Sequence, residues 1–327
     1  MASPLVDSYG RVHRDLRISV TDRCNYRCTY CMPADGLRWL PRDELLTFEE
    51  IERIARVLVE HHGIDAIRLT GGEPTVRADL PGLVARLAPL GTDLAMTTNG
   101  SKLAALAAPL AEAGLRRINV SCDSLHAGRF AEMTRRDDLP AVLAGIDAAL
   151  AAGLTPVKVN VVLQQGVNSD EIVDFASFGR SRGLTIRFIE MMPLDADGAW
   201  SGGDVVASHD IVAAIGAVFP HEPVQRDHEP AARWRYLDGG GEFGVIGSVT
   251  EPFCASCDRL RLTADGRLRS CLFSTDETDL RAVLRSGGSD DDLAAAIEAT
   301  VAAKGPGHQI GQAAFIRPRR SMSQIGG

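Results

Sequence analysis

The stretch DLRISVTDRCNYRCTYC, residues 15–31, decides the fold. Its first half alternates apolar and polar residues, which predicts a β-strand with Leu16, Ile18 and Val20 on one face. Its second half places three cysteines directly after that strand. In barrels built from parallel strands and helices, the carboxyl ends of the strands carry the active site. The stretch therefore predicts a barrel strand that leads into a cysteine-containing site.

Five more strand patterns follow along the chain, at residues 64–70, 93–98, 116–121, 156–162 and 184–190. Helical patterns separate them, and one of these begins with a capping box of Thr47 and Glu50. Six strand–helix units predict an α/β protein with a parallel sheet and outer helices. Because a closed barrel has eight such units, six favour an open, partial (βα)6 barrel of the TIM type.

The strand–helix rhythm ends after about residue 218. Beyond it we expect short strands at 233–237 and 243–249, a hairpin at 259–273 and helices near 277–286 and 290–303. The last residues, IRPRRSMSQIGG, are expected to be extended and flexible. The chain is thus predicted to have a barrel, residues 1–225, and a smaller α+β region, residues 226–327, with a flexible Gly-Gly tail.

Composition excludes several classes of protein. The 327 residues are 45% hydrophobic and 24% charged, which argues against disorder. The net charge of −8 argues against a broad nucleic-acid surface. No apolar run reaches the roughly 18 residues of a membrane span, and the first residues contain no apolar signal core. We expect a cytoplasmic protein, either a monomer or a homodimer, that binds neither nucleic acid nor a membrane.

The seven cysteines point to metal. An odd number without a secretion signal argues against a disulfide framework. Cys122 is expected to be a small buried residue. The other six form a first triad and a second triad: Cys24, Cys28 and Cys31, then Cys254, Cys257 and Cys271. Three thiolates favour a soft metal, and in a four-iron cluster they leave one iron free for another ligand. Two zinc alternatives stay open: one structural site shared by both triads, or a zinc knuckle built on the second triad.

Strand alternation predicts a polar lumen. Arg17, Arg68 and Lys158 fall on the faces opposite the apolar ones, and Arg259 and Arg261 share one face of a later strand. Such a lumen suits a polar ligand, because arginine and lysine both bind phosphate oxygens. The alternative is that these cations pair with Glu73, Asp123 or Glu190. The other two lysines, Lys102 and Lys304, are expected on solvated helices.

The segment CNYRCTYC, residues 24–31, resembles the cluster motif of the radical S-adenosylmethionine (SAM) enzymes. The resemblance implies that Cys24, Cys28 and Cys31 hold a [4Fe–4S] cluster whose open iron binds the methionine part of SAM. The segment GGEP, residues 71–74, is similar to the site for the methionine amine in that superfamily. The residues that the resemblance implies as cofactor contacts are Tyr30, Gly72, Ser121 and Met192.

The segment FCASCDRLRLTADGRLRSCLF, residues 253–273, resembles the second cluster segment of the GTP 3′,8-cyclase family of molybdenum cofactor biosynthesis. The resemblance runs from Arg17 to Gly326-Gly327. It implies a second [4Fe–4S] cluster on the second triad, which is thought to bind guanine. The implied GTP contacts are Arg17, Arg68, Thr97, Lys158, Arg259, Leu260 and Arg261. Gly326 and Gly327 are implied to enter the active site beside the catalytic first triad and to assist catalysis.

The implied activity is that of a radical SAM lyase. It would convert GTP to (8S)-3′,8-cyclo-7,8-dihydroguanosine 5′-triphosphate, which cyclic pyranopterin monophosphate synthase would then consume, and it would need an electron donor that the sequence does not identify. Two other functions are considered. A radical SAM peptide-modifying enzyme with an auxiliary cluster would usually carry more carboxy-terminal cysteines. A zinc-stabilised nucleic-acid-binding module would need a basic face.

Overall fold

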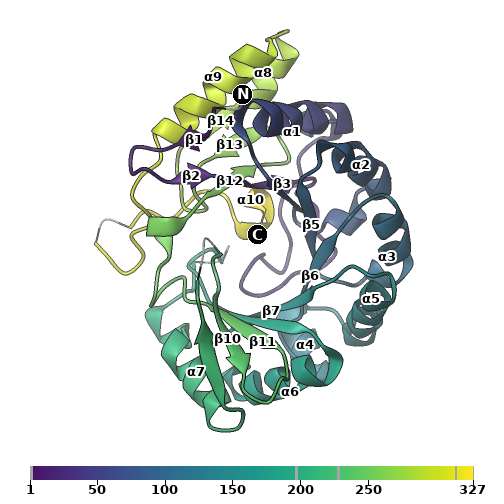
Figure 1. Ribbon diagram of the computed structural model, residues 1–327, viewed down its shortest axis with the longest axis vertical. Coiled ribbons are helices and arrows are strands. Elements are labelled where there is room, and N and C mark those ends of the chain that lie inside the picture. The colour runs from purple at the N-terminus through teal and green to yellow at the C-terminus, as the bar shows by residue number, and fades with distance from the viewer. Residues whose placement is uncertain (1–2, 196–197, 227–228, 314, 327) are drawn as a thin grey trace.

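A curved wall of parallel strands surrounds the centre of the molecule, and helices cover its outer side (Figure 1). The computed structural model describes residues 3–195, 198–226, 229–313 and 315–326. Within these residues the parallel strands follow the spatial order β12 (Arg259–Leu262), β3 (Asp15–Ser19), β4 (Ala66–Thr70), β5 (Asp93–Thr98), β6 (Arg117–Ser121), β7 (Val157–Leu163), β8 (Thr185–Glu190) and β11 (Glu242–Ile246).

Antiparallel strands extend both edges of this wall. Next to β12 lie β13 (Arg267–Arg269) and β14 (Thr278–Asp279), and next to β11 lie β10 (Ala232–Tyr236) and β9 (His221–Val224). The two edges do not pair with each other, so the barrel is open. A separate hairpin consists of β1 (Leu5–Val6) and β2 (Val12–His13).

All six strands predicted from alternation are confirmed as β3 to β8. The expected partial barrel is therefore present. The carboxy-terminal part of the chain adds β12 beside β3 and β11 beside β8, so it continues the same sheet at both ends. The boundary near residue 225 stays a prediction.

Seven helices follow the barrel strands along the chain and are listed here with their bounds: α1 (Phe48–His62), α2 (Leu80–Leu87), α3 (Leu103–Glu112), α4 (Ala127–Thr134), α5 (Leu139–Ala151), α6 (Ile172–Arg182) and α7 (Ser208–Gly216). Helices α8 (Leu280–Arg285) and α9 (Asp290–Ala302) lie over the β13–β14 edge (Figure 1). The Thr47–Glu50 capping box at the start of α1 is confirmed. None of the described helices has the length and apolar character that crossing a membrane requires.

The last helix, α10 (Met322–Ile325), lies inside the ring of strands (Figure 1). Our expectation of an extended tail is wrong here, because a capping box of Ser321 and Gln324 starts a helical turn. Its Ile325 side chain is 1% exposed. The end of the chain is thus part of the barrel interior.

The outward faces of the strands form the core, as their alternation predicts. Leu16 and Ile18 of β3 are fully buried among the helices, and Cys122 is buried in the same core. Leu260 of β12 is also fully buried in this core, between two lumen-facing arginines of the same strand.

Replacing Leu260 tests this packing. We expect Leu260→Ala to lower the free energy of unfolding by about 2–5 kcal/mol, because it leaves a cavity in the core. Leu237→Ala is the matched control, since that leucine is 62% exposed and its loss should change stability by less than about 0.5 kcal/mol. Urea unfolding of both variants provides the comparison. Equal stability of the two would contradict the packing of β12 described here.

Candidate active site

One cavity inside the ring contains residues of both cysteine triads. Its volume is about 260 Å³, and all six cysteines of the two triads contribute to its wall. These cysteines are free thiols, with none joined in a disulfide. Two groups of soft donors from opposite ends of the chain therefore face one space, as an enzyme with two neighbouring clusters requires.

The first triad lies on the loop after β3, and the loop after β4 packs directly against it. The amide of Gly72 donates a hydrogen bond to the carbonyl of Thr21 at 2.8 Å, and the amide of Glu73 donates to that of Arg23 at 2.8 Å. A Cβ atom on Gly72 would lie 2.5 Å from the carbonyl oxygen of Arg23. The glycine at position 72 therefore allows the cysteine loop to approach closely.

Burial dominates the acidity of the first triad. It raises the pKa of Cys24 to about 11 and that of Cys31 to about 12. Without a metal these thiols would stay protonated at neutral pH, whereas a bound iron–sulfur cluster holds its ligands as thiolates. Three unbridged thiols with a shared opening fit a [4Fe–4S] cluster that keeps one iron open.

The second triad has a different electrostatic setting. Burial would raise the pKa of Cys257, but the charges of Arg259 and Lys304 outweigh it and lower that pKa to about 7. On the other side, a Cβ atom on Gly307 would lie 2.5 Å from the Cβ of Cys254, so only glycine allows this approach. Neighbouring cations thus stabilise the thiolate of Cys257, whereas burial raises the pKa of Cys254.

The predicted SAM contacts Tyr30, Gly72, Ser121 and Met192 all line the cavity. The hydroxyl of Tyr30 donates a hydrogen bond to Oδ2 of Asp123 at 2.7 Å. The other oxygen of that carboxyl group accepts from the amide of Val162 at 2.8 Å. Burial raises the pKa of Asp123 to about 6. The Tyr30 side chain is therefore held at the cavity wall by a partner that is itself fixed.

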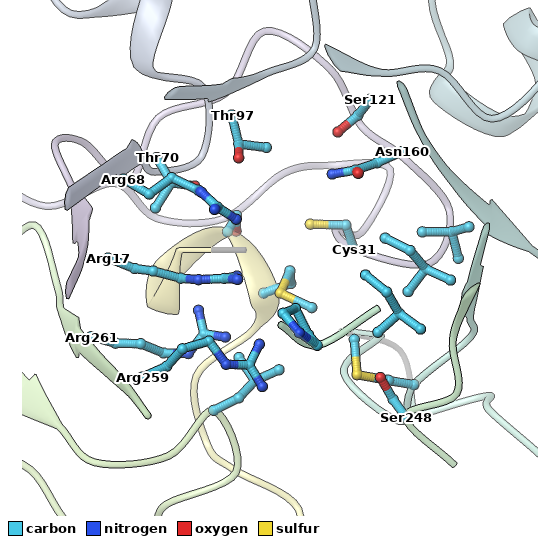
Figure 2. A pocket seen from close by; sticks show the side chains of 18 of the residues that line it. Arg17, Cys31, Arg68, Thr70, Thr97, Ser121, Asn160, Ser248, Arg259 and Arg261 are labelled. Carbon is cyan, nitrogen blue, oxygen red and sulfur yellow. The ribbon is translucent and has the colours of Figure 1, made fainter. Parts of the chain in front are cut away.

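Four arginines point into the cavity from three adjacent strands (Figure 2). Strand pairing places Arg261 beside Arg17, and Arg17 beside Arg68. Arg259 lies two residues before Arg261 on β12. The Nε atoms of Arg17 and Arg68 are buried and have no hydrogen-bond partner. The sheet register therefore gathers guanidinium groups whose donors are not all used.

One carboxylate, Asp15 at the start of β3, offsets part of the charge of this arginine group: burial opposes its ionisation, but the charges of the four arginines lower its pKa. In the described part of the chain, no ion pair joins any of the four to a carboxylate. Glu73, Asp123 and Glu190 accept hydrogen bonds from backbone amides and hydroxyl groups instead, so the alternative of ion pairing with them is wrong. Burial, reinforced by neighbouring cations, lowers the pKa of Arg17 well below its usual value and that of Arg261 to about 9. The cavity is thus suited to an anion.

Two family models match the chain. That of the Radical SAM superfamily covers residues 18–179, and that of Molybdenum Cofactor Synthesis C covers residues 184–310. A GTP 3′,8-cyclase of Corynebacterium glutamicum is 49% identical over 99% of this chain and 89% of its own length. GTP 3′,8-cyclase 2 of Mycobacterium tuberculosis is also 49% identical, over 99% of this chain and 92% of its own length. The chain belongs to the GTP 3′,8-cyclase family.

Solved structures support the fold of this family member. The structure of Streptococcus suis SuiB bound to S-adenosylmethionine superposes with a TM-score of 0.58 and 13% identity, and covers 84% of this chain and 67% of that one. Membership of the GTP 3′,8-cyclase family implies two [4Fe–4S] clusters and SAM as cofactors, and the donor sets of both triads fit them.

The structure places most of the predicted GTP contacts at the cavity wall and two of them away from it. Arg17, Arg68, Thr97, Arg259 and Arg261 line the cavity. The side chain of Leu260 points into the core on the opposite face of β12, so only the backbone of this residue is available for a contact with GTP. Lys158 is not part of the cavity wall, although burial and the charge of Arg187 lower its pKa to about 8.

The end of the chain reaches this site as well. Gly326 is buried, and its carbonyl accepts a hydrogen bond from Nη1 of Arg261 at 2.6 Å. A Cβ atom on Gly326 would lie 2.9 Å from Cγ2 of Thr70, and its φ of +88° favours glycine. Gly327 lies outside the described residues. Gly326 therefore occupies a position beside the arginine group that suits no larger residue.

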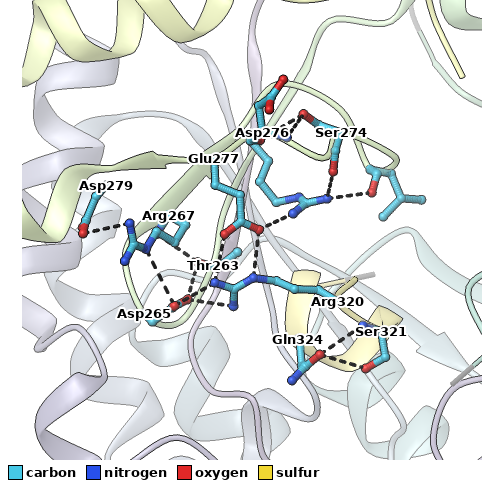
Figure 3. Close-up of polar contacts among 12 residues, drawn as sticks. Thr263, Asp265, Arg267, Ser274, Asp276, Glu277, Asp279, Arg320, Ser321 and Gln324 are labelled. Atoms are coloured by element: carbon cyan, nitrogen blue, oxygen red, sulfur yellow. Dashed lines mark hydrogen bonds and ion pairs between the residues drawn. The ribbon is translucent and has the colours of Figure 1, made fainter. Parts of the chain in front are cut away.

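An ion-pair network anchors the segment before α10. Arg320 bonds Asp265 at 2.8 Å and Glu277 at 2.9 Å, and Figure 3 shows how these groups surround its guanidinium. Through this anchor Met322 and Ser323 are brought to the cavity wall. Arg320 therefore docks the tail against the rest of the protein.

Sequence reasoning missed several cavity residues, of which Arg187 is the clearest. It is 6% exposed and donates hydrogen bonds to Asn160 at 3.2 Å and Asn119 at 2.9 Å. Residues 186–188 of β8 are buried on both faces, so alternation carried no signal there. Met322 and Ser323 were missed because a four-residue helix has no periodicity to detect.

Gly72→Ala tests the packing of the two loops at the first triad. The added methyl group would displace the cysteine loop, so we expect reduced iron at the first triad and normal iron at the second. Gly128→Ala is the control, since a Cβ atom there meets nothing within 4 Å. Iron and sulfide analysis after anaerobic reconstitution gives the contents. Full iron in Gly72→Ala would show that the loops need not approach so closely.

Proposed function

We propose that this protein is a radical SAM lyase that converts GTP to (8S)-3′,8-cyclo-7,8-dihydroguanosine 5′-triphosphate, the first step of molybdenum cofactor biosynthesis. The relatives named GTP 3′,8-cyclase match nearly the whole chain. The observation that carries the proposal is the cavity in which two cysteine triads flank four arginines, none of which forms an ion pair with a carboxylate in the described part of the chain.

Residues at or just after the carboxyl ends of barrel strands would hold the cofactor. The first triad supplies three thiolates, and Tyr30, Gly72, Ser121 and Met192 lie around it at the cavity wall. Bound together, the reduced cluster and SAM supply the radical chemistry of the superfamily. The task of the chain is then to position the nucleotide beside SAM and to exclude water.

Residues of the adjoining strands would bind the triphosphate. Arg17, Arg68, Arg259 and Arg261 offer several charge-assisted hydrogen bonds, and a triphosphate carries about the opposite charge. Binding it would relieve the repulsion among the arginines. Lys158 would add charge from outside the cavity wall, and Leu260 would contribute only through its backbone. The second triad, facing the same space, would hold the cluster that binds the guanine.

The tail residues Gly326 and Gly327 are proposed to lie beside the bound nucleotide and to assist catalysis. The hydrogen bond from Arg261 to Gly326 supports this, because it ties the tail to a residue of the arginine group. The proposed reaction takes place in the cytoplasm. It needs an electron donor, and a downstream cyclic pyranopterin monophosphate synthase would consume its product. The peptide-modifying alternative is not supported by the relatives, and the likeness to SuiB shows the fold alone.

The substrate assignment is tested by turnover. The protein is reconstituted anaerobically with iron and sulfide and is then incubated with SAM, a reductant and either GTP or ATP. We expect 5′-deoxyadenosine to form with GTP and only weakly with ATP. Chromatographic measurement of 5′-deoxyadenosine gives the result. Equal formation with ATP, or none with either nucleotide, would refute the assignment.

Arg68→Ala tests the phosphate site. Losing a hydrogen bond to a charged group costs about 1.5–3 kcal/mol, so we expect GTP to bind about 10- to 100-fold more weakly. Arg14→Ala is the matched control, because the Arg14 side chain is 56% exposed and lies near Asp65. Anaerobic calorimetry measures the affinity, and iron analysis checks both clusters. Unchanged GTP affinity in Arg68→Ala would place the phosphates elsewhere.

A further inference from the structure

Lys304 is a buried cation that the proposed function leaves unused. We expected it on a solvated helix surface, and that expectation is wrong, since it is 3% exposed just beyond the end of α9. By contrast Lys102 is exposed, as expected. No ion pair among the described residues joins Lys304 to a carboxylate. A buried ammonium group without such a partner requires another source of negative charge.

The sulfur of Cys257 is that source. The Nζ atom of Lys304 lies 3.7 Å from Sγ of Cys257. It also donates hydrogen bonds to the carbonyl oxygens of Cys257 and Arg259, both at 3.2 Å. The ammonium group is therefore fixed by the carbonyl of the ligand residue itself and by that of Arg259 two residues later, within reach of the Cys257 sulfur.

The amino-terminal hairpin holds Lys304 in this position. Nδ1 of His13 lies 3.5 Å from Nζ of Lys304, and Nε2 of His13 lies 3.1 Å from Oδ2 of Asp7. An ammonium group can only donate and a carboxylate can only accept, so the two contacts assign the proton to Nε2. Burial and the charge of Lys304 lower the pKa of His13 to about 4, which agrees with a neutral ring.

Arg11 of the same hairpin binds the loops that carry Cys254 and Gly305. Arg11 donates hydrogen bonds to the carbonyl of Cys254 at 2.8 Å and to that of Gly305 at 2.6 Å. Its Nε pairs with Asp7 at 2.6 Å. Asp7 thus orients two chains of contacts. One runs through His13 and Lys304 to Cys257, and the other runs through Arg11 to Cys254. Both chains of contacts end at residues of the second triad.

We propose that Lys304 is a positioning residue of the second cluster, held by His13 and Asp7, whose ammonium group donates to the Cys257 sulfur and raises the reduction potential of that cluster. Reduction adds negative charge to a cluster, and hydrogen bonds and nearby positive charge favour the reduced form. The inference rests on the second cluster that the proposed function requires.

The test measures the second cluster alone. In a full-length chain whose first triad is replaced by alanine, the only cluster signal comes from the second triad. Potentiometric titration followed by electron paramagnetic resonance then gives its reduction potential. The variants are Lys304→Met, which keeps length without charge, Lys304→Arg, which keeps charge, and His13→Asn. Lys102→Met is the matched control, because that lysine is exposed.

We expect Lys304→Met to retain the cluster and to lower its reduced-to-oxidised ratio at a fixed potential about tenfold, which equals 59 mV for one electron. Lys304→Arg should restore most of the shift, His13→Asn should produce a smaller shift of the same sign, and Lys102→Met should produce none. An unchanged potential in both Lys304→Met and His13→Asn would overturn the proposal.

Loss of second-cluster iron from Lys304→Met would also overturn it, since the lysine would then only hold the Cys257 loop together. Failure of the proposed function would give experimental results different from those that overturn the role of Lys304. In that case the unsubstituted second triad would hold no [4Fe–4S] cluster, or the fully loaded enzyme would not act on GTP.

Discussion

Positive charge that neighbouring carboxylates offset only in part is the constraint on which the site depends. Taking guanidinium groups out of water is costly unless an anion compensates them. In this barrel the sheet register fixes Arg261, Arg17 and Arg68 side by side, so the groups cannot separate to relieve their repulsion. The packed core around the lumen holds the arginines in place despite this repulsion. An anionic ligand that enters the lumen would relieve it.

The second determinant is the pairing of β12 with β3. It places the strand that leads into the first triad beside the strand that follows Cys257. One set of backbone hydrogen bonds therefore brings together two metal-binding segments from distant parts of the chain. The geometry of the reaction space depends on this pairing more than on either loop.

Much of this arrangement could be predicted from the sequence. Four of the six barrel strands alternate cleanly, so their faces and the polar lumen followed from periodicity, and cysteine spacing indicated both triads. The family motif placed Leu260 among the GTP contacts, although Arg259 and Arg261 on one face already implied that its side chain faces the other. Lys304 could not be placed, because its burial depends on a hairpin from the opposite end of the chain. Arg187 was missed because β8 is buried on both sides.

The β12–β3 pairing also bears on how the protein is made. During synthesis β3 emerges early, with only β4 available as a neighbour, and β12 leaves the ribosome much later. Contacts between such distant segments form slowly, because a long loop must close first. The chamber for the iron–sulfur groups thus forms only after residues 259–262 have been synthesised. Delivery of iron and sulfide to the second triad must therefore follow the synthesis of Cys271.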